Sequence, residues 1–252
     1  MNLSQRLDAV AMMVTEGNRL ADIGTDHAFV PIFLAESGRI PSALAMDVNR
    51  GPLERAGAHI REHGLEARIT TRLSDGLLSL KEGEADTVLI AGMGGALTVR
   101  ILQHRRDLYR EIRELILQPQ SEIASVRRYL ERSGWRIVRE RMVFEDGKYY
   151  QMMRCIPGRM SLTGPEARFG PCLMRERPAV WMEFLLWRKG ILEKNLSCLQ
   201  DAEGRRGEMR RMEVRQEIDE ISSILYPDPR QGICQSESHP FSDEGSQEEV
   251  TA

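Results

Sequence analysis

Short segments rich in apolar residues alternate with segments of helical spacing over the first 132 residues of the chain. The run Val88-Leu89-Ile90 has no polar interruption, which is typical of a parallel strand covered on both faces. Leu3, Leu7, Val10 and Val14 recur every three or four residues, which predicts a helix. The alternation predicts an α/β sheet, with strands at 20–23, 43–48, 67–73, 85–91 and 115–119 and helices at 4–15, 27–38, 52–63, 97–104 and 121–132.

Two more β-like segments follow, at 135–143 and 148–156, with Asp146-Gly147 between them. Asp-Gly is a strong signal for a tight hairpin turn, so these strands are expected to run antiparallel to each other. With the five earlier strands they predict one open sheet of seven strands.

The C-terminal third has a different pattern. Residues 157–171 are rich in Gly and Pro, which predicts a linker. Beyond it, two long helices are expected at 178–202 and 205–225, and an antiparallel coiled-coil hairpin would bury both apolar seams. The seams consist of Trp181, Leu185, Leu192, Leu196 and Leu199 in the first helix and Val214, Ile218, Ile221 and Leu225 in the second.

The predicted organisation is therefore a domain at 1–157, a helical hairpin at 158–226 and a disordered tail at 227–252. The formal net charge is −3, but residues 226–252 carry −5, so the first 225 residues carry +2. Eleven arginines stand against six acids between Arg100 and Arg141. They either form an RNA-facing patch or belong to ordinary solvated helix faces.

Composition argues for the cytoplasm. The four cysteines are widely spaced and fit no metal-ligand pattern, as expected of free thiols in a reducing compartment. No apolar run approaches the roughly 18 to 20 residues that span a bilayer, and the N-terminus lacks the features of a leader. We expect no metal and no membrane partner, and a monomer rather than an obligate oligomer.

Candidate binding residues begin at the first strand–turn–helix. Asp22, Gly24, Thr25 and Asp26 follow the strand at the sheet edge where parallel α/β folds bind ligands. Gly24 allows close approach of a ligand, while the acidic turn suits an amine-bearing or cationic ligand better than a pyrophosphate. S-adenosylmethionine is therefore favoured over a dinucleotide, and the alternative is a plain structural turn. Arg6 of the first helix is expected near the mouth of this site.

Acidic residues also end the next two strands. Asp47 can accept hydrogen bonds from both ribose hydroxyls while Val48 covers the base, although Asp47 could instead cap the following helix. Asp75, with Gly76, can accept from the exocyclic amine of an adenine, or can simply form a loop. Three acids at successive strand ends favour the cofactor interpretation.

The fourth strand leads into Ala91, Gly92, Met93, Gly94 and Gly95. Ala91 and Gly92 are expected beside the cofactor, and Gly94 and Gly95 leave backbone bare for a flat substrate base. The other interpretation is a flexible turn before a helix. The fifth strand ends in a polar amide, in Gln118-Pro119, which is a further substrate-binding candidate.

The segments 22–28, 47–53, 75–77, 90–95 and 117–119 together resemble the bacterial tRNA (adenine(22)-N1)-methyltransferase family. The resemblance covers about residues 4–225. It implies a Rossmann-like class I methyltransferase domain, S-adenosylmethionine as methyl donor and a C-terminal coiled coil that helps to hold tRNA. The predicted function is SAM-dependent methylation of N1 of adenine 22 in tRNA.

The transfer needs positioning more than acid–base catalysis, because adenine N1 has its own lone pair. Asp26, His27 and Met93 are the candidate catalytic residues in that positioning sense. On the hairpin, Arg206, Arg210 and Arg211 are the candidate tRNA contacts, or they form a solvated helix face. The alternatives are a methyltransferase for another RNA base or small molecule, and a non-catalytic SAM- or RNA-binding protein.

Overall fold

The computed structural model describes residues 1–199 and 204–227. It divides into two compact units, Met1–Phe184 and Leu185–Ala252. The predicted tail at 227–252 lies, apart from Pro227, outside the described residues.

A seven-stranded sheet forms the centre of the first unit, in the order β3-β2-β1-β4-β5-β7-β6. Strands β1 to β5 are parallel, and β7 runs antiparallel to both β5 and β6. The seven-stranded sheet with an antiparallel final pair is confirmed. The strands are β1 Leu20–Ile23, β2 Ala43–Asp47, β3 Ile69–Leu73, β4 Thr87–Met93, β5 Glu114–Pro119, β6 Trp135–Glu145 and β7 Lys148–Pro157.

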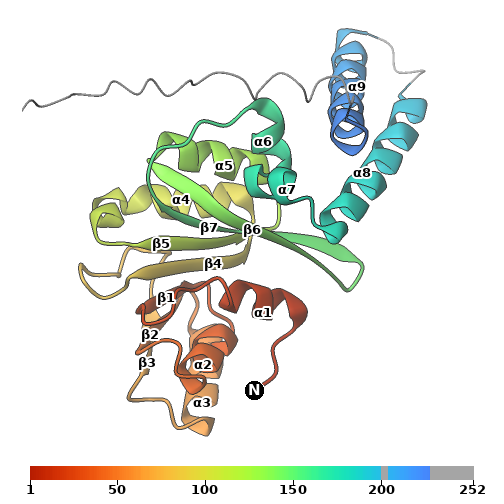
Figure 1. Ribbon diagram of the computed structural model, residues 1–252. Helices are drawn as coiled ribbons and strands as arrows, with labels where there is room; N and C mark the ends of the chain where they lie inside the picture. The colour runs from red at the N-terminus through yellow and green to blue at the C-terminus, as the bar shows by residue number, and fades with distance from the viewer. Residues whose placement is uncertain (200–203, 228–252) are drawn as a thin grey trace, which may run out of the picture. The chain divides into compact units, whose positions relative to one another are not determined.

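Helices cover both faces of this sheet, as Figure 1 shows. One apolar core lies between the sheet and α4 and α5, with Leu102 and Leu130 fully buried, and a second lies beneath α1, α2 and α3. Strand order reverses between β1 and β4, so the carboxyl ends of these two neighbours flank the crevice where such sheets bind ligands. The helices are α1 Gln5–Ala11, α2 Phe29–Glu36, α3 Arg50–Glu62, α4 Gly95–His104 and α5 Ile123–Arg132, with a short 3₁₀ helix, η1, at Arg106–Arg110.

Helix α1 begins as expected but ends early. The Ser4 hydroxyl accepts a hydrogen bond from the Leu7 N–H at 3.4 Å, which caps the helix. The helix ends at Ala11 rather than near Thr15, because Thr15 is bound elsewhere. Its N–H and hydroxyl donate to the buried Glu114 carboxylate at 2.8 and 2.7 Å.

The prediction of a linker at 157–171 is wrong. This segment contains α6 (Gly164–Phe169) and leads directly into α7 (Pro171–Glu176). Thr163 and Glu166 form a reciprocal capping box at the start of α6, and Pro165 falls in its first turn, where no intrahelical donor is lost. The first unit therefore continues past the sheet to Phe184 instead of ending near residue 157.

A buried ion pair ties this segment to the sheet. Arg127 of α5 and Glu140 of β6 lie 2.8 Å apart, with side chains 0% and 1% exposed. Glu140 also accepts from the Cys172 N–H of α7 at 2.8 Å, and Arg127 donates to the Ala167 carbonyl of α6 at 3.1 Å. Arg127 therefore belongs to no RNA-facing patch.

Two helices complete the described chain, α8 (Ala179–Cys198) and α9 (Arg205–Leu225). Trp181 is fully buried and donates from Nε1 to the Phe169 carbonyl at 3.1 Å, so it belongs to the first unit and not to the hairpin seam. In the second unit Arg188 and Glu217 join the two helices at 2.8 Å. Five of the expected seam residues are buried in this unit: Leu185, Leu192, Val214, Ile221 and Leu225. Coiled-coil packing of the two helices stays a prediction.

Three cysteines are described and all are free thiols, buried at Cys155 and Cys172 and exposed at Cys198. Within 1–199 and 204–227, no helix has the length and apolar character needed to span a membrane.

Candidate functional site

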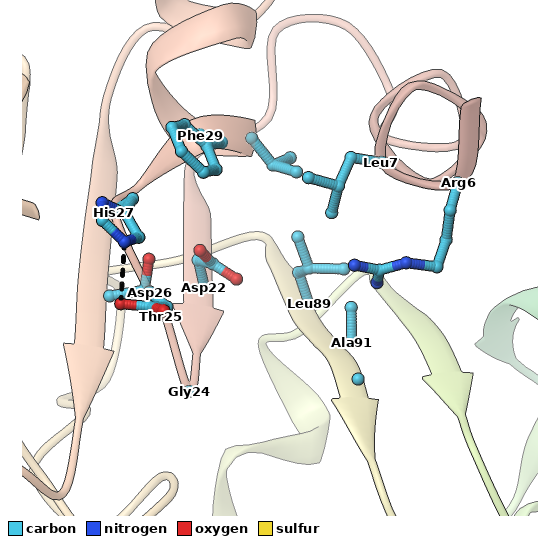
Figure 2. Close-up of a pocket in the computed structure, with 12 residues that line it drawn as sticks. Arg6, Leu7, Asp22, Gly24, Thr25, Asp26, His27, Phe29, Leu89 and Ala91 are labelled. Carbon is cyan, nitrogen blue, oxygen red and sulfur yellow. Dashed lines mark ion pairs between the residues drawn. The ribbon is translucent and has the colours of Figure 1, made fainter. Parts of the chain in front are cut away.

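A cleft of about 250 Å³ opens at the carboxyl ends of β1 and β4, beside α1. Seven predicted site residues line it, and Arg6 lies at it as expected. Figure 2 shows how these side chains surround the space. The predicted residues in the lining are Asp22, Gly24, Thr25, Asp26, His27, Ala91 and Gly92, and Leu7, Phe29, Val30 and Leu89 add apolar surface that the sequence reasoning did not assign.

The turn after β1 needs a glycine at residue 24. Gly24 has φ +76°, and a β-carbon there would overlap the terminal methyl of Met93. The N–H groups of Gly24 and Thr25 both donate to the Met46 carbonyl, at 2.8 and 3.0 Å, which fixes the turn to the neighbouring strand. Backbone is therefore exposed to the cleft without a side chain in the way.

Asp22 forms the acidic floor of the cleft. Burial raises the pKa of its carboxyl to about 6, and the nearby Asp47 carboxylate adds to the rise, while the Thr25 hydroxyl opposes it. Asp22 forms no ion pair with any described residue. The buried Thr25 hydroxyl makes no hydrogen bond of normal geometry within the described chain. The Asp22 carboxylate on the floor can therefore accept hydrogen bonds from a cationic ligand.

Asp26 and His27 lie at the rim. Asp26 accepts from the Arg55 Nη2 at 2.8 Å and lies 3.6 Å from the His27 Nε2. The His27 ring stacks on Phe29, with centroids 5.1 Å apart and planes 6° apart, and lies 4.9 Å from the His59 ring. Arg55 and His59 were missed, although their spacing of four residues on α3 places them on one helix face.

Gln118 occupies a different place from the one expected. Its side chain is fully buried, and its carbonyl oxygen accepts from Arg6 Nη1 at 3.1 Å and from the Gly92 N–H at 3.0 Å. Pro119 is buried too. Neither side chain is exposed to a substrate in this structure, and Gln118 instead links α1 to the end of β4.

The ends of β2 and β3 lie beside the cleft rather than in its lining. Asp47 is half-buried, and its Oδ1 accepts from the Asn49 N–H at 2.7 Å, while Val48 is exposed. Asp75 is exposed. Gly76 is buried, with φ +57°, and a β-carbon there would lie 2.9 Å from Ile101. Packing against α4 therefore accounts for this glycine.

Packing also accounts for the glycines that open α4. A β-carbon on Gly95 would overlap the Ser121 carbonyl oxygen, and one on Gly94 would lie 3.2 Å from the Ser121 hydroxyl. Both glycines let α4 approach the loop between β5 and α5. Met93 is the last residue of β4, half-buried, with its side chain against Gly24.

The predicted tRNA contacts lie on α9 in the second unit. Arg206 and Arg210 are exposed, and Arg210 pairs with Glu213 at 2.9 Å. Arg211 is half-buried and donates to the Leu199 carbonyl at 3.0 Å, so it also closes the hairpin. Among the described residues, no group of three His, Cys, Asp or Glu side chains could hold a metal ion.

Comparison with known proteins adds to this geometry. A family model described as a methyltransferase domain matches residues 3–153. The tRNA (adenine(22)-N(1))-methyltransferase of Bacillus subtilis is 32% identical over 229 residues, covering 86% of this chain and 95% of that protein. The chain belongs to the tRNA (adenine(22)-N(1))-methyltransferase family. Two solved structures extend the family comparison to bound ligands.

Sp1610 of Streptococcus pneumoniae, solved in complex with S-adenosyl-L-methionine, is 34% identical, with a TM-score of 0.82 over 89% of this chain and 100% of that one. TrmK of M. capricolum, solved with S-adenosyl-homocysteine, is 27% identical, with a TM-score of 0.78 over 88% and 97% of the two chains. Because both alignments include nearly the whole of the other chain, this family shares the C-terminal part as well as the sheet.

Proposed function

We propose that this protein transfers a methyl group from S-adenosylmethionine to N1 of adenine 22 in tRNA. The observation that carries the proposal is the cleft at the β1–β4 switch point, in a chain with this family membership. Its floor holds the Thr25 hydroxyl and the Asp22 carboxylate, and Asp22 forms no ion pair with a described residue. An unpaired acid favours a ligand with an ammonium group, and a nearby glycine turn favours close contact with its backbone.

The residues around the cleft fit the cofactor. Asp22 and Thr25 would receive its amine, and Gly24, Ala91 and Gly92 would flank its amino-acid half. The second oxygen of Asp47 would accept from the ribose hydroxyls, since Asn49 occupies only Oδ1. Val48 and Asp75 would meet the adenine face and its exocyclic amine. When bound, the sulfonium supplies an activated methyl group on a good leaving group.

The protein's own task is then to hold the acceptor base in line with that methyl group. Adenine N1 lies on the Watson–Crick edge, so the base has to leave its stack to enter the cleft. The stacked His27 and Phe29 rings give the rim a flat aromatic surface for such a base, and Arg55 holds Asp26 beside them. Met93 would limit the depth to which the base enters. Positioning of this kind supplies most of the acceleration, and no general base is needed.

The substrate extends beyond the cleft. Arg206, Arg210 and Arg211 on α9 would contact tRNA phosphates, which attract arginine through charge and bidentate hydrogen bonds. The enzyme would act in the cytoplasm as a monomer.

Methyl transfer in vitro tests the proposal. Purified full-length protein is incubated with S-adenosylmethionine and with a tRNA transcript that carries adenine or guanine at position 22, and the digests are analysed by mass spectrometry. We expect 1-methyladenosine in the first transcript alone. A different methylated nucleoside would identify another target base, and cofactor binding without any transfer would indicate a binding protein. Asp47→Ala should reduce cofactor affinity by roughly 1–3 kcal/mol.

A further inference from the structure

The guanidinium of Arg6 is held in place inside the cleft wall. It donates to the Gln118 carbonyl oxygen at 3.1 Å and lies 5.4 Å from the centre of the Tyr150 ring. Gln118 is fully buried, and its carbonyl oxygen also accepts from the Gly92 N–H. This oxygen is therefore fixed in position and cannot move with the Arg6 side chain. Arg6 is thus fixed at two points, and Figure 2 shows it reaching from α1 toward Leu89 and Ala91 of β4.

This cation lacks an acidic partner. Glu145 is the nearby acid, and its carboxylate accepts from the Arg6 backbone N–H at 3.4 Å. Within residues 1–199 and 204–227, no carboxylate forms an ion pair with the Arg6 guanidinium. A half-buried guanidinium has five donors, and Gln118 uses one of them. The N–H donors that Gln118 does not use are available to the cleft, which Arg6 lines.

The cleft is therefore polarised. Asp22 and Asp26 lie on the β1 side and Arg6 on the α1 side, and Figure 2 shows the Asp22 carboxyl and the Arg6 guanidinium on opposite sides of the same space. An α-amino acid group carries an ammonium and a carboxylate on the same carbon. A wall with an acid and a facing wall with a guanidinium match these two charges.

We propose that Arg6 binds the α-carboxylate of the cofactor's amino-acid half. This inference rests on the proposed function, which supplies the cofactor. A tRNA phosphate is the other anion that a guanidinium could receive. The carboxylate is favoured because the contacts with the buried Gln118 and the half-buried Tyr150 direct Arg6 toward β4 and the interior of the cleft.

Calorimetry with two ligands tests the assignment. S-adenosylhomocysteine carries the amino-acid half, and 5′-methylthioadenosine has the same nucleoside without it. Arg6→Gln should weaken S-adenosylhomocysteine binding by about 10- to 100-fold, the usual effect of losing a hydrogen bond to a charged group. Binding of 5′-methylthioadenosine should change less than about twofold, and Arg6→Lys should recover part of the loss because it keeps the charge.

A matched control is Arg113→Gln. The Arg113 side chain is 72% exposed and lies at the amino end of β5, whereas the cleft lies at the carboxyl ends of the strands. Arg113→Gln should therefore leave the affinities for both ligands unchanged. Unchanged S-adenosylhomocysteine affinity in Arg6→Gln, with a lower tRNA affinity and a flatter salt dependence, would assign Arg6 to phosphate and overturn the inference. An equal loss for both ligands would overturn it too, by showing that Arg6 only maintains the cleft. Wild-type protein that binds neither ligand would instead contradict the proposed function.

Discussion

Gly24 lies so close to the terminal methyl of Met93 that no β-carbon fits between them. The two residues come from the ends of β1 and β4, the strands that flank the cleft, and Gly24 also has a positive φ. One glycine therefore meets two separate demands, one conformational and one steric.

Substitutions at this pair should separate the two demands. Gly24→Ala should cost roughly 1–2 kcal/mol of folding free energy for the left-handed backbone and should also displace Met93 into the cleft, which weakens cofactor binding. Adding Met93→Ala should restore binding but not stability. Urea denaturation and calorimetry on both variants measure the two effects. If the double variant binds as poorly as Gly24→Ala, the contact with Met93 is not what matters for binding.

Asp22 should make stability depend on pH. Because burial raises its pKa from 3.8 to about 6, the folded protein keeps a proton that the unfolded chain has already released between these values. Its contribution to stability therefore falls as pH rises from 4 to 6 and stays low above that range. Asp22→Asn should stabilise the ligand-free protein by up to about 3 kcal/mol at pH 8 and by almost nothing below pH 4.

Denaturant unfolding at both pH values measures this difference, and the same variant should lose cofactor affinity. A stability difference that is equal at pH 4 and pH 8 would show that Asp22 does not titrate differently in the folded state.

The boundary of the first unit predicts which truncations fold. A chain that ends at Phe184 keeps α6, α7 and Trp181, so it should unfold cooperatively and bind cofactor. A chain that ends at Pro157 loses the Ala167 carbonyl and Cys172 N–H that hydrogen-bond the Arg127–Glu140 pair, together with the buried Phe169, Leu173 and Trp181. It should therefore lose cooperative unfolding, because this much apolar burial and hydrogen bonding is a large part of a domain's stability. Circular dichroism melts distinguish the two. Cooperative melting of the shorter chain would show that α6 and α7 are dispensable.

The same ion pair predicts a large effect from a single substitution. Glu140→Ala leaves Arg127 buried without its acid and should cost about 3–5 kcal/mol, whereas Arg127→Met combined with Glu140→Leu should cost much less. Exposed Arg210 and Glu213 provide the comparison, since breaking their pair should cost a few tenths of a kcal/mol. Similar losses in the single and double core variants would contradict this account.

For tRNA, Arg206→Ala combined with Arg210→Ala is the cleaner variant, because Arg211 also holds the Leu199 carbonyl. If both residues contact phosphates, tRNA affinity should fall and its dependence on salt should flatten by roughly one unit of slope per lost contact. Cofactor affinity should not change. Binding measured across a salt series checks this, and coincident lines for wild type and variant would exclude the two arginines from the interface.

The strands and their acidic ends could be predicted from sequence, because a parallel strand covered on both faces needs a continuous apolar run and its ligand edge tolerates charge. The expectation that polar residues at the ends of strands face the ligand was wrong for Gln118, whose side chain is buried. It is buried because β5 is covered on both faces, and two N–H donors satisfy its oxygen. The pairing of Arg127 with Glu140 depends on the packing of two elements, which spacing along the chain does not record.

The helical patterns did not indicate which part of the protein each apolar face packs against. Trp181 has the spacing of the hairpin seam yet contacts Phe169 in the first unit, because periodicity indicates that a face is buried but not what covers it. The expected linker shows the opposite error. Its Gly and Pro content outweighed the signature Thr163-x-x-Glu166, which is the sequence form of the capping box that begins α6.

The pairing of β1 with β4 also affects how the chain is made. Leu20 pairs with Thr87, so the strand that carries the acidic turn has one edge unpaired until two intervening strands and their helices have been synthesised. Proteins emerge from the ribosome N-terminus first, and an unpaired strand edge invites pairing with other chains. The cleft cannot exist on the nascent chain before β4 appears, and during that interval one edge of β1 is open to pairing with other chains.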